Sequence, residues 1–272
     1  MSVGIQPLAV HGSARVRRIN PVAKLLASLA IAAPLILTID VVSAAVALGL
    51  VLLLLPLTGI GWSAFWRRTW PIWLAAPLGA LTILLYGRPS GQSYFSWGFI
   101  DINEGSIQLA VATMLRVLAV GLPSVVLFMT VDVTDLGDGL AQVLHVPARF
   151  VLGAMAGLRT VGLFVEDWRS MQLARRARGV AETGRLRQLF GMIFAIFVLA
   201  IRRGSKLATT MEARGFGATT DAEGNPVART WARPSTFGRR EWVLVAVGVA
   251  ISATAVAVAV ATGSWNFIFG QS

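Results

Sequence analysis

The triplet Ala-Arg-Gly occurs twice in the basic middle of the chain, with its two arginines 36 residues apart. Each copy closes a long run of helical character. An arginine in the last turn suits the negative end of the helix dipole, and the glycine after it can take the left-handed conformation that ends a helix. Capping explains one copy, but two matched copies predict two helix ends that offer the same contact to a partner. The candidate contact residues are Ala177, Arg178, Gly179, Ala213, Arg214 and Gly215.

The residues that most catalysis requires are scarce. The chain has no cysteine and only two histidines, His11 and His145, without a second ligand or carboxylate at a supporting spacing. Neither Lys24 nor Lys206 stands in a phosphate-loop motif. The adjacent Glu166-Asp167 pair is expected on a solvated helix face. The sequence therefore predicts a non-catalytic chain that holds no cofactor or metal and does not hydrolyse ATP by itself.

One charge, Arg116, falls in the middle of an apolar run. A charge inside a membrane is costly and faces protein or water rather than lipid. Its partner can be a backbone carbonyl, a hydroxyl such as that of Thr113, or a group on another subunit. Arg116 is accordingly a candidate for an intramembrane partner contact, with a packing role as the alternative.

Composition sets the fold class that must position these residues. The 272 residues are 56% hydrophobic and only 14% charged, and the mean hydropathy is +0.70. An ordinary soluble domain has roughly a quarter charged residues. The sequence predicts an all-α polytopic membrane protein whose surroundings are the lipid bilayer. The net charge of +11 then marks a cytoplasmic face rather than nucleic-acid binding, since no nucleic-acid module is recognisable.

Five apolar runs are long enough for membrane spans, which need roughly 20 helical residues. Lys24, near the start of the first, is expected to snorkel towards water. In the last, the small residues Ala253, Ala257 and Ala261 recur every four positions and can admit a neighbouring helix. The expected spans are Val22 to Leu37, Val41 to Leu57, Ile72 to Tyr86, Ser106 to Met129 and Trp242 to Thr262.

The distribution of lysine and arginine along the chain predicts its orientation in the membrane. With a cytoplasmic N-terminus, Arg67 and Arg68 lie inside in a loop between spans two and three, as does the basic segment from Arg149 to Arg240. Only Arg88 falls in an outer loop. We therefore expect a multi-pass protein of the cell membrane with an external C-terminus.

The middle segment contains two further apolar stretches, which could form a transmembrane hairpin. Such a hairpin would place the six arginines between the stretches outside the cell, against the positive-inside rule. We therefore expect two long amphipathic helices at the inner membrane surface, Ala148 to Arg178 and Gly184 to Arg214. A shorter amphipathic helix, Thr134 to Leu144, precedes them. The predicted domains are a four-span membrane domain at 1–129, a cytoplasmic coupling module at 130–240, and a final span with a short tail at 241–272.

These features resemble the transmembrane T component of energy-coupling factor transporters, the CbiQ and BioN type of family. The resemblance extends over nearly the whole chain. Its motifs are the opening Asn20-Pro21-x-x-Lys24, the Leu115-Arg116 pair, the Thr134 to Pro147 approach, and the two Ala-Arg-Gly triplets.

The resemblance implies a division of labour between subunits. In that family the paired arginines, here Arg178 and Arg214, insert into grooves on two ABC-type ATPase subunits. A separate substrate-binding S component takes up a vitamin or a metal ion, and ATP is bound by the partner subunits. Two other classes stay open on the residues alone, namely a polytopic membrane enzyme and a self-contained carrier. Only the coupling interpretation requires ATPase subunits to accompany the chain.

Overall fold

The computed structural model describes residues 15–86, 93–97, 100–179, 184–216, 231 and 233–265. These residues divide into two compact units. The first, the bundle, comprises the described residues up to Gly139 together with those from Ser235 onwards. The second, the arm, lies between Leu140 and Pro234. The three domains predicted from the sequence stay a prediction.

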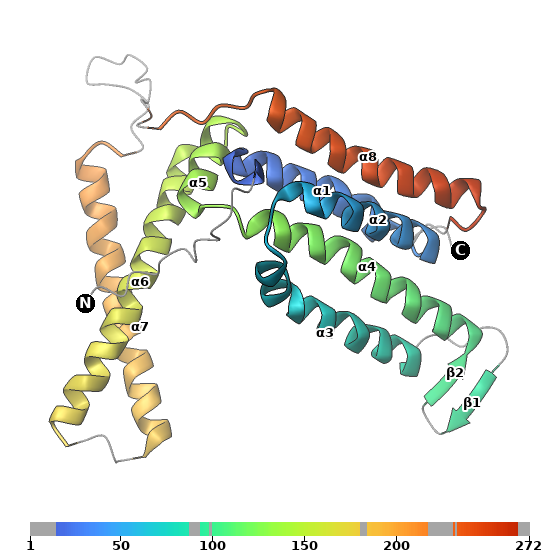
Figure 1. Ribbon diagram of the computed structural model, residues 1–272. Helices are drawn as coiled ribbons and strands as arrows, with labels where there is room; N and C mark the ends of the chain where they lie inside the picture. The colour runs from blue at the N-terminus through green and yellow to red at the C-terminus, as the bar shows by residue number, and fades with distance from the viewer. Residues whose placement is uncertain are drawn as a thin grey trace. The chain divides into compact units, whose positions relative to one another are not determined.

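Five long helices build the bundle (Figure 1). The α4 helix packs against α1, α2 and α3, and α8 packs against α1 and α2. The elements are η1 (Arg15–Arg18), α1 (Pro21–Leu37), α2 (Val41–Leu54), η2 (Leu55–Thr58), α3 (Trp62–Tyr86), β1 (Ser93–Trp97), β2 (Ile100–Asn103), α4 (Glu104–Phe128) and α8 (Arg239–Ala261).

Polar side chains define where these helices begin. The Asn20 side chain accepts a hydrogen bond from Val22 N at 3.0 Å at the start of α1. Asp40 accepts from Ser43 N at the start of α2, and Asn103 accepts from Ser106 N at the start of α4. Each cap satisfies a backbone N–H group that has no partner within its helix. The caps lie at the boundaries of apolar runs, which is why the span positions were readable from the sequence.

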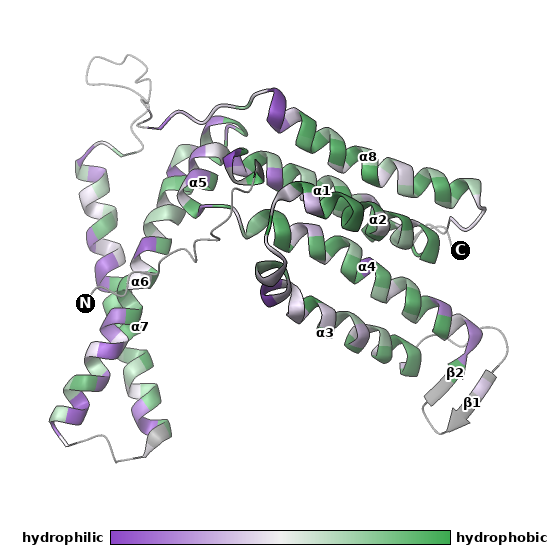
Figure 2. Cartoon of the chain, in the orientation of Figure 1, coloured by the Kyte–Doolittle hydropathy of each residue, from purple (hydrophilic) through white to green (hydrophobic). Residues whose placement is uncertain are grey.

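The arm consists of two long helices and the end of a short one. The short helix α5 (Val133–Gln142) crosses from the bundle into the arm, and α6 (Ala148–Ala177) and α7 (Arg185–Ala213) follow. Bundle helices α1, α2, α4 and α8 are almost continuously hydrophobic, whereas α6 and α7 alternate between apolar and charged stretches (Figure 2). The predicted long helices are thus confirmed to within one residue at each end.

The fold class is confirmed, with one addition. The regular structure of the described residues is helical except for a small antiparallel hairpin, β1 with β2, between α3 and α4. The sequence showed no sign of this hairpin. The α3 helix also starts ten residues earlier than expected, so Arg67 and Arg68 lie within it rather than in a loop. The mixture of tryptophan and arginine in its first turns hid its true start.

Length and composition allow five of the helices to cross a membrane, but the set differs from the predicted one. The α6 helix qualifies with 30 residues, whereas α1 has 17 and is shorter than the roughly 20 residues of a typical span. Helical hydropathy supports a multi-pass membrane protein. The position of α6 at the inner membrane surface depends on the distribution of arginine and stays a prediction.

The packing of α8 corrects one expectation. Ala253, Ala257 and Ala261 are exposed, and the buried small residues Gly248, Ser252, Ala255 and Ala259 form the packed face instead. A Cβ atom added to Gly248 would lie 2.8 Å from the carbonyl oxygen of Ala27, so the two backbones are in close contact there. An alanine-rich helix offers several small faces, and its sequence alone did not select the right one.

The position of Lys24 corrects a second expectation. Its side chain is 1% exposed rather than snorkelling, and Nζ donates to Thr130 Oγ1 at 2.9 Å and to Thr130 O at 3.3 Å. Thr130 follows the end of α4, so the lysine joins the start of α1 to the end of α4.

Candidate coupling surface on the arm

The two Ala-Arg-Gly triplets form closely similar helix ends. At the end of α6, Arg178 N donates to Ala174 O at 3.2 Å and Gly179 N donates to Arg176 O at 3.1 Å. Gly179 has a φ of +69°, in the left-handed region. A residue with a Cβ atom is strained in that region, so the glycine is required by the turn.

The end of α7 repeats this geometry. Gly215 has a φ of +75°, and its N–H group donates to Glu212 O at 2.9 Å. Phe216 N donates to Met211 O at 2.9 Å, which completes a Schellman motif. The residue that would make the corresponding bond after Gly179 lies outside the described residues.

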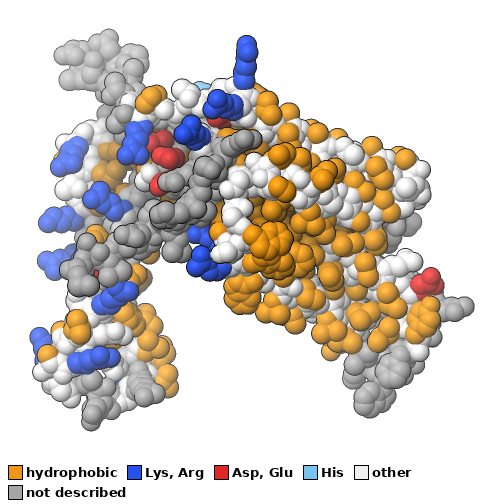
Figure 3. Space-filling model, in the orientation of Figure 1, with side chains coloured by type: hydrophobic (Ala, Val, Ile, Leu, Met, Phe, Trp, Pro, Cys, Tyr) orange, Lys and Arg blue, Asp and Glu red, His pale blue; other side chains and the backbone are white. Residues whose placement is uncertain are grey.

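Both arginines of the triplets are accessible to a partner. Arg178 and Arg214 are exposed, and neither side chain makes a hydrogen bond or ion pair with another described residue. Each guanidinium therefore has its planar set of donors available for a carboxylate or a carbonyl of a partner. Lysine and arginine side chains are spread over the arm in Figure 3, with few acidic side chains between them.

The α6 and α7 helices run in opposite directions and cross, so that the two triplets lie at opposite ends of the pair (Figure 1). Arg203 on α7 binds Asp167 on α6 at the crossing, with Nη1 and Nη2 at 2.5 and 3.1 Å from the two carboxylate oxygens. The guanidinium of Arg203 also lies 5.8 Å from the ring centroid of Phe164. Glu166 is exposed, as expected of a solvated face, whereas Asp167 is only partly exposed and is paired with Arg203.

A continuous apolar stripe on α7 remains exposed. Its members recur at helical spacing, and the four most exposed side chains have exposed fractions of 60 to 72%. An exposed apolar patch of this extent marks contact with membrane or with another protein. The stripe consists of Leu186, Leu189, Phe190, Ile193, Phe194, Phe197, Val198 and Ile201.

Arg116 lies on α4 inside the bundle, as expected. Its Nε and Nη2 atoms are buried and have no hydrogen-bond partner among the described residues. A buried carboxylate in the same bundle is that of Asp40, which is 4% exposed and accepts from Ser43 N and Ser43 Oγ at 2.6 and 2.7 Å. The sequence reasoning missed this carboxylate because it stands just before the second span. A role of Arg116 in contacting a partner stays a prediction.

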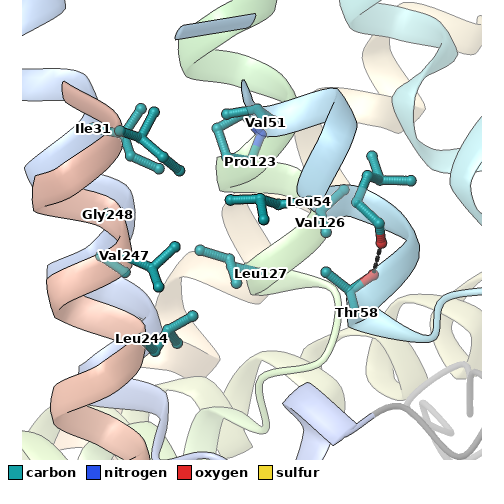
Figure 4. Close-up of a pocket in the computed structure, with 13 residues that line it drawn as sticks. Ile31, Val51, Leu54, Thr58, Pro123, Val126, Leu127, Leu244, Val247 and Gly248 are labelled. Atoms are coloured by element: carbon teal, nitrogen blue, oxygen red, sulfur yellow. Dashed lines mark hydrogen bonds between the residues drawn. The ribbon is translucent and has the colours of Figure 1, made fainter. Parts of the chain in front are cut away.

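An apolar cavity of about 90 Å³ lies between α1, α2, α4 and α8 (Figure 4). Its one hydroxyl, that of Thr58, donates to Leu55 O at 2.6 Å and is thereby satisfied. A polar or charged substrate would lose hydrogen bonds with water on entering it. The cavity suits hydrocarbon and does not provide a binding site for a metal ion or a polar vitamin.

Comparison with protein families identifies the chain. The model of the CbiQ family, described as cobalt transport protein, matches residues 12–223. The chain belongs to the CbiQ family. This family match covers α1 to α7 together with both Ala-Arg-Gly triplets.

The chain is also similar to proteins named as transporter components. The chain is 27% identical over 250 residues to the energy-coupling factor transporter transmembrane protein EcfT of Brevibacillus brevis, covering 88% of this chain and 91% of the relative. It is 27% identical to EcfT of Bacillus subtilis over 221 residues, covering 76% and 82%. For EcfT of Limosilactobacillus fermentum the identity is 27% over 197 residues, covering 67% and 72%. This CbiQ-family chain is thus a transmembrane component of an energy-coupling factor transporter.

Proposed function

We propose that this transmembrane component couples two ABC-type ATPase subunits to a separate substrate-binding S component during import. The observation that supports this most directly is the pair of matched helix ends, each with an exposed arginine that has no partner within the described chain. A motor with two similar subunits requires two similar contact points. Because α6 and α7 cross in opposite directions, the two contact points lie at opposite ends of this helix pair.

Arg178 and Arg214 bind the two ATPase subunits in this proposal. Each guanidinium makes charge-assisted hydrogen bonds to a carboxylate or to carbonyl groups in a groove of its ATPase. Ala177 and Ala213 leave room for close approach at the helix ends, while Gly179 and Gly215 turn the chain away. ATP is bound and hydrolysed by the partners, and this chain holds no cofactor and performs no catalysis.

The exposed apolar stripe on α7 faces the S component or the lipid around it. The first half of α7 is apolar and its second half contains Arg202, Arg203 and Lys206. One helix therefore extends from an apolar environment to a basic end that suits the cytosol. The S component binds the substrate, a vitamin or a transition-metal ion, and Arg116 is a candidate for a further contact with it inside the membrane.

The proposed orientation places the N-terminus and the arm in the cytoplasm and the C-terminus outside. The arm contains most of the arginines of the chain, and the positive-inside rule assigns such a segment to the cytoplasm. The ATPases need this orientation because ATP is cytoplasmic.

Purification from native membranes with a tag on this chain tests the proposal. We expect two ABC-type ATPase subunits, or one fused pair, and a small membrane protein to be recovered with it. A polytopic enzyme or a self-contained carrier would be recovered active without ATPases. Recovery of a transport-competent chain free of ATPase subunits would contradict the coupling function.

A further inference from the structure

The bundle leaves a space between α4 and α8. The α8 helix packs against α1 and α2, but α4 and α8 are not among the closely packed helix pairs of the described bundle. The apolar cavity of about 90 Å³ lies between them, and Figure 4 shows Leu244 and Val247 of α8 facing Leu127 of α4 across it. An empty cavity loses contacts that close packing would provide, so a molecule that fills it would stabilise the bundle.

The cavity is buried at one end and open at the other. Its inner end is lined by Ile31, Val51 and Ile251, which are 4 to 7% exposed. Towards the start of α8, Val247 is 37% exposed and Leu244 is partly exposed. Leu244 lies five residues, or about 8 Å, beyond the first residue of α8. The cavity therefore opens near the ends of the helices and extends along them into the bundle.

The lining of the cavity suits a hydrocarbon chain. Its hydroxyl group, on Thr58, is already bonded to Leu55 O, and apolar cavities of this kind stay dry and bind apolar molecules. The volume is about three times the share of one water molecule in the liquid. The cavity can therefore hold a segment of an acyl chain, while the rest of the molecule lies outside.

The face of α8 that lines the cavity begins with an arginine. Arg240 stands four residues before Leu244, and Val247 and Ile251 follow at spacings of three and four. Residues at these spacings lie on one face of a helix. Arg240 is exposed and makes no hydrogen bond or ion pair with another described residue. Because helical side chains lean towards the start of their helix, Arg240 can reach a charged group just outside the cavity.

Aromatic side chains indicate that this end of α8 lies at a membrane boundary. Trp242 is exposed, and its ring packs edge to face on Phe237 with centroids 5.3 Å apart. Tryptophan favours the level of the lipid headgroups. Glu241 accepts from Gly238 N at 2.9 Å as part of the helix cap, so it does not pair with Arg240. The open end of the cavity thus lies just below the headgroups, with an arginine above it.

The turn η1 adds positive charge at the same place. Its buried Val16 packs with three residues of the cavity wall, Ala27, Leu127 and Leu244. The other three residues of η1 are arginines, and the side chain of Arg18 is exposed. A phosphate group at the open end of the cavity would therefore lie near basic residues of both η1 and α8.

We propose that the cavity and the basic residues at its open end bind one anionic phospholipid. A segment of one acyl chain lies between α4 and α8, and the phosphate group lies between Arg240 and η1. In the proposed orientation this lipid belongs to the cytoplasmic leaflet, whose anionic lipids attract basic segments. The bound lipid joins α8 to α4, two helices that do not pack closely on each other.

Two pairs of substitutions distinguish this site from general attraction to lipid. Arg240→Gln removes the charge on the cavity face, and Arg239→Gln removes the same charge one position earlier, on a different face of α8. Val247→Phe fills part of the cavity. Val249→Phe adds the same volume at an exposed position outside the cavity.

Native mass spectrometry of the purified full-length chain, titrated with phosphatidylglycerol or with phosphatidylcholine of the same acyl chains, measures binding. We expect one phosphatidylglycerol to bind more tightly than phosphatidylcholine. Arg240→Gln should weaken phosphatidylglycerol binding about fivefold, the effect of one basic residue near an anionic surface, and leave phosphatidylcholine binding unchanged. Arg239→Gln should have a smaller effect. Val247→Phe should lose tight binding of both lipids, and Val249→Phe should keep it.

Thermal melting shows whether the variants fold. Phosphatidylglycerol should raise the melting temperature of the wild type and of Val249→Phe but not that of Val247→Phe, whose lipid-free form should be at least as stable as the wild type. Equal affinity for the two lipids, or equal weakening in Arg239→Gln and Arg240→Gln, would overturn the headgroup contact. Tight binding in Val247→Phe would overturn the acyl-chain site. These measurements need no ATPase, so their outcome is independent of the coupling function.

Discussion

Asp167 and Arg203 join α6 to α7, and each stands eleven residues before the arginine of its own triplet. Eleven residues are about three helical turns, or about 16 Å along the axis. Arg178 and Arg214 are therefore equally distant from the ion pair and lie nearly on the helix faces of Asp167 and Arg203. The crossing gives the arm an approximate two-fold symmetry in the spacing of its contacts, which suits two similar ATPase subunits.

Substituting Asp167 by Asn should impair coupling more than stability. The pair is 26 to 37% exposed, and exposed ion pairs contribute about 0.2 to 1 kcal/mol. We expect a small change in melting temperature but reduced simultaneous binding of two ATPases, because the register of α6 against α7 loosens. The reversed pair Asp167→Arg with Arg203→Asp should restore two-site binding when measured by the stoichiometry of the purified complex. No recovery in the reversed pair would argue against the register role.

The glycines of the triplets should resist substitution more than other helix glycines. Gly179→Ala and Gly215→Ala place a Cβ atom in the left-handed region, at a cost of about 1 to 2 kcal/mol each. Matched controls are Gly153→Ala and Gly204→Ala, which stand within α6 and α7 with open space around them and should be neutral or stabilising. ATPase pull-down and thermal melting compare the four variants. Equal effects at all four positions would mean that the helix ends have no special conformation.

Much of this architecture follows from local signals in the sequence. Apolar runs, helix caps at Asn20 and Asn103, and the Arg-Gly ends each depend on residues close together in the chain. The contacts that were missed join residues far apart, such as Lys24 with Thr130 and Asp167 with Arg203. Nothing local distinguishes a lysine that snorkels from one that is buried against a distant threonine.

Arg116→Leu should leave the isolated bundle at least as stable as the wild type. The substitution removes Nε and Nη2, two buried donors without a partner in the described chain, whose burial has a cost of about 1 to 3 kcal/mol. If Arg116 contacts a partner, assembly with the S component or uptake should fall. Met114→Leu on the exposed side of α4 is the control. Normal assembly and uptake in Arg116→Leu would contradict a partner contact.

Single cysteines test the proposed orientation. A cysteine at Ser170 on α6 should react with a membrane-impermeant thiol reagent only from the cytoplasmic side, because the basic arm is retained there. A cysteine at Ser93 in β1 should react only from outside. The native chain has no cysteine, so all labelling reports the introduced site. Labelling of Ser170→Cys from outside would mean that α6 crosses the membrane.

Binding of ATPase subunits to the double variant Arg178→Ala with Arg214→Ala tests the central claim most directly. Each arginine bound in a groove should contribute about 2 to 5 kcal/mol to local binding when its loss leaves a buried partner charge, whereas its contribution to its own helix end is about 1 kcal/mol or less. Each single variant should cripple uptake and retain part of the complex. Lysine should give an intermediate result, because it keeps the charge without the planar donors. The double variant should be folded, free of ATPases and inactive in uptake. The matched control is Arg169→Ala with Arg202→Ala, which removes the same charge from exposed positions on the same helices. This control should retain both ATPase binding and uptake. Full ATPase binding and full uptake in the double variant would contradict the account.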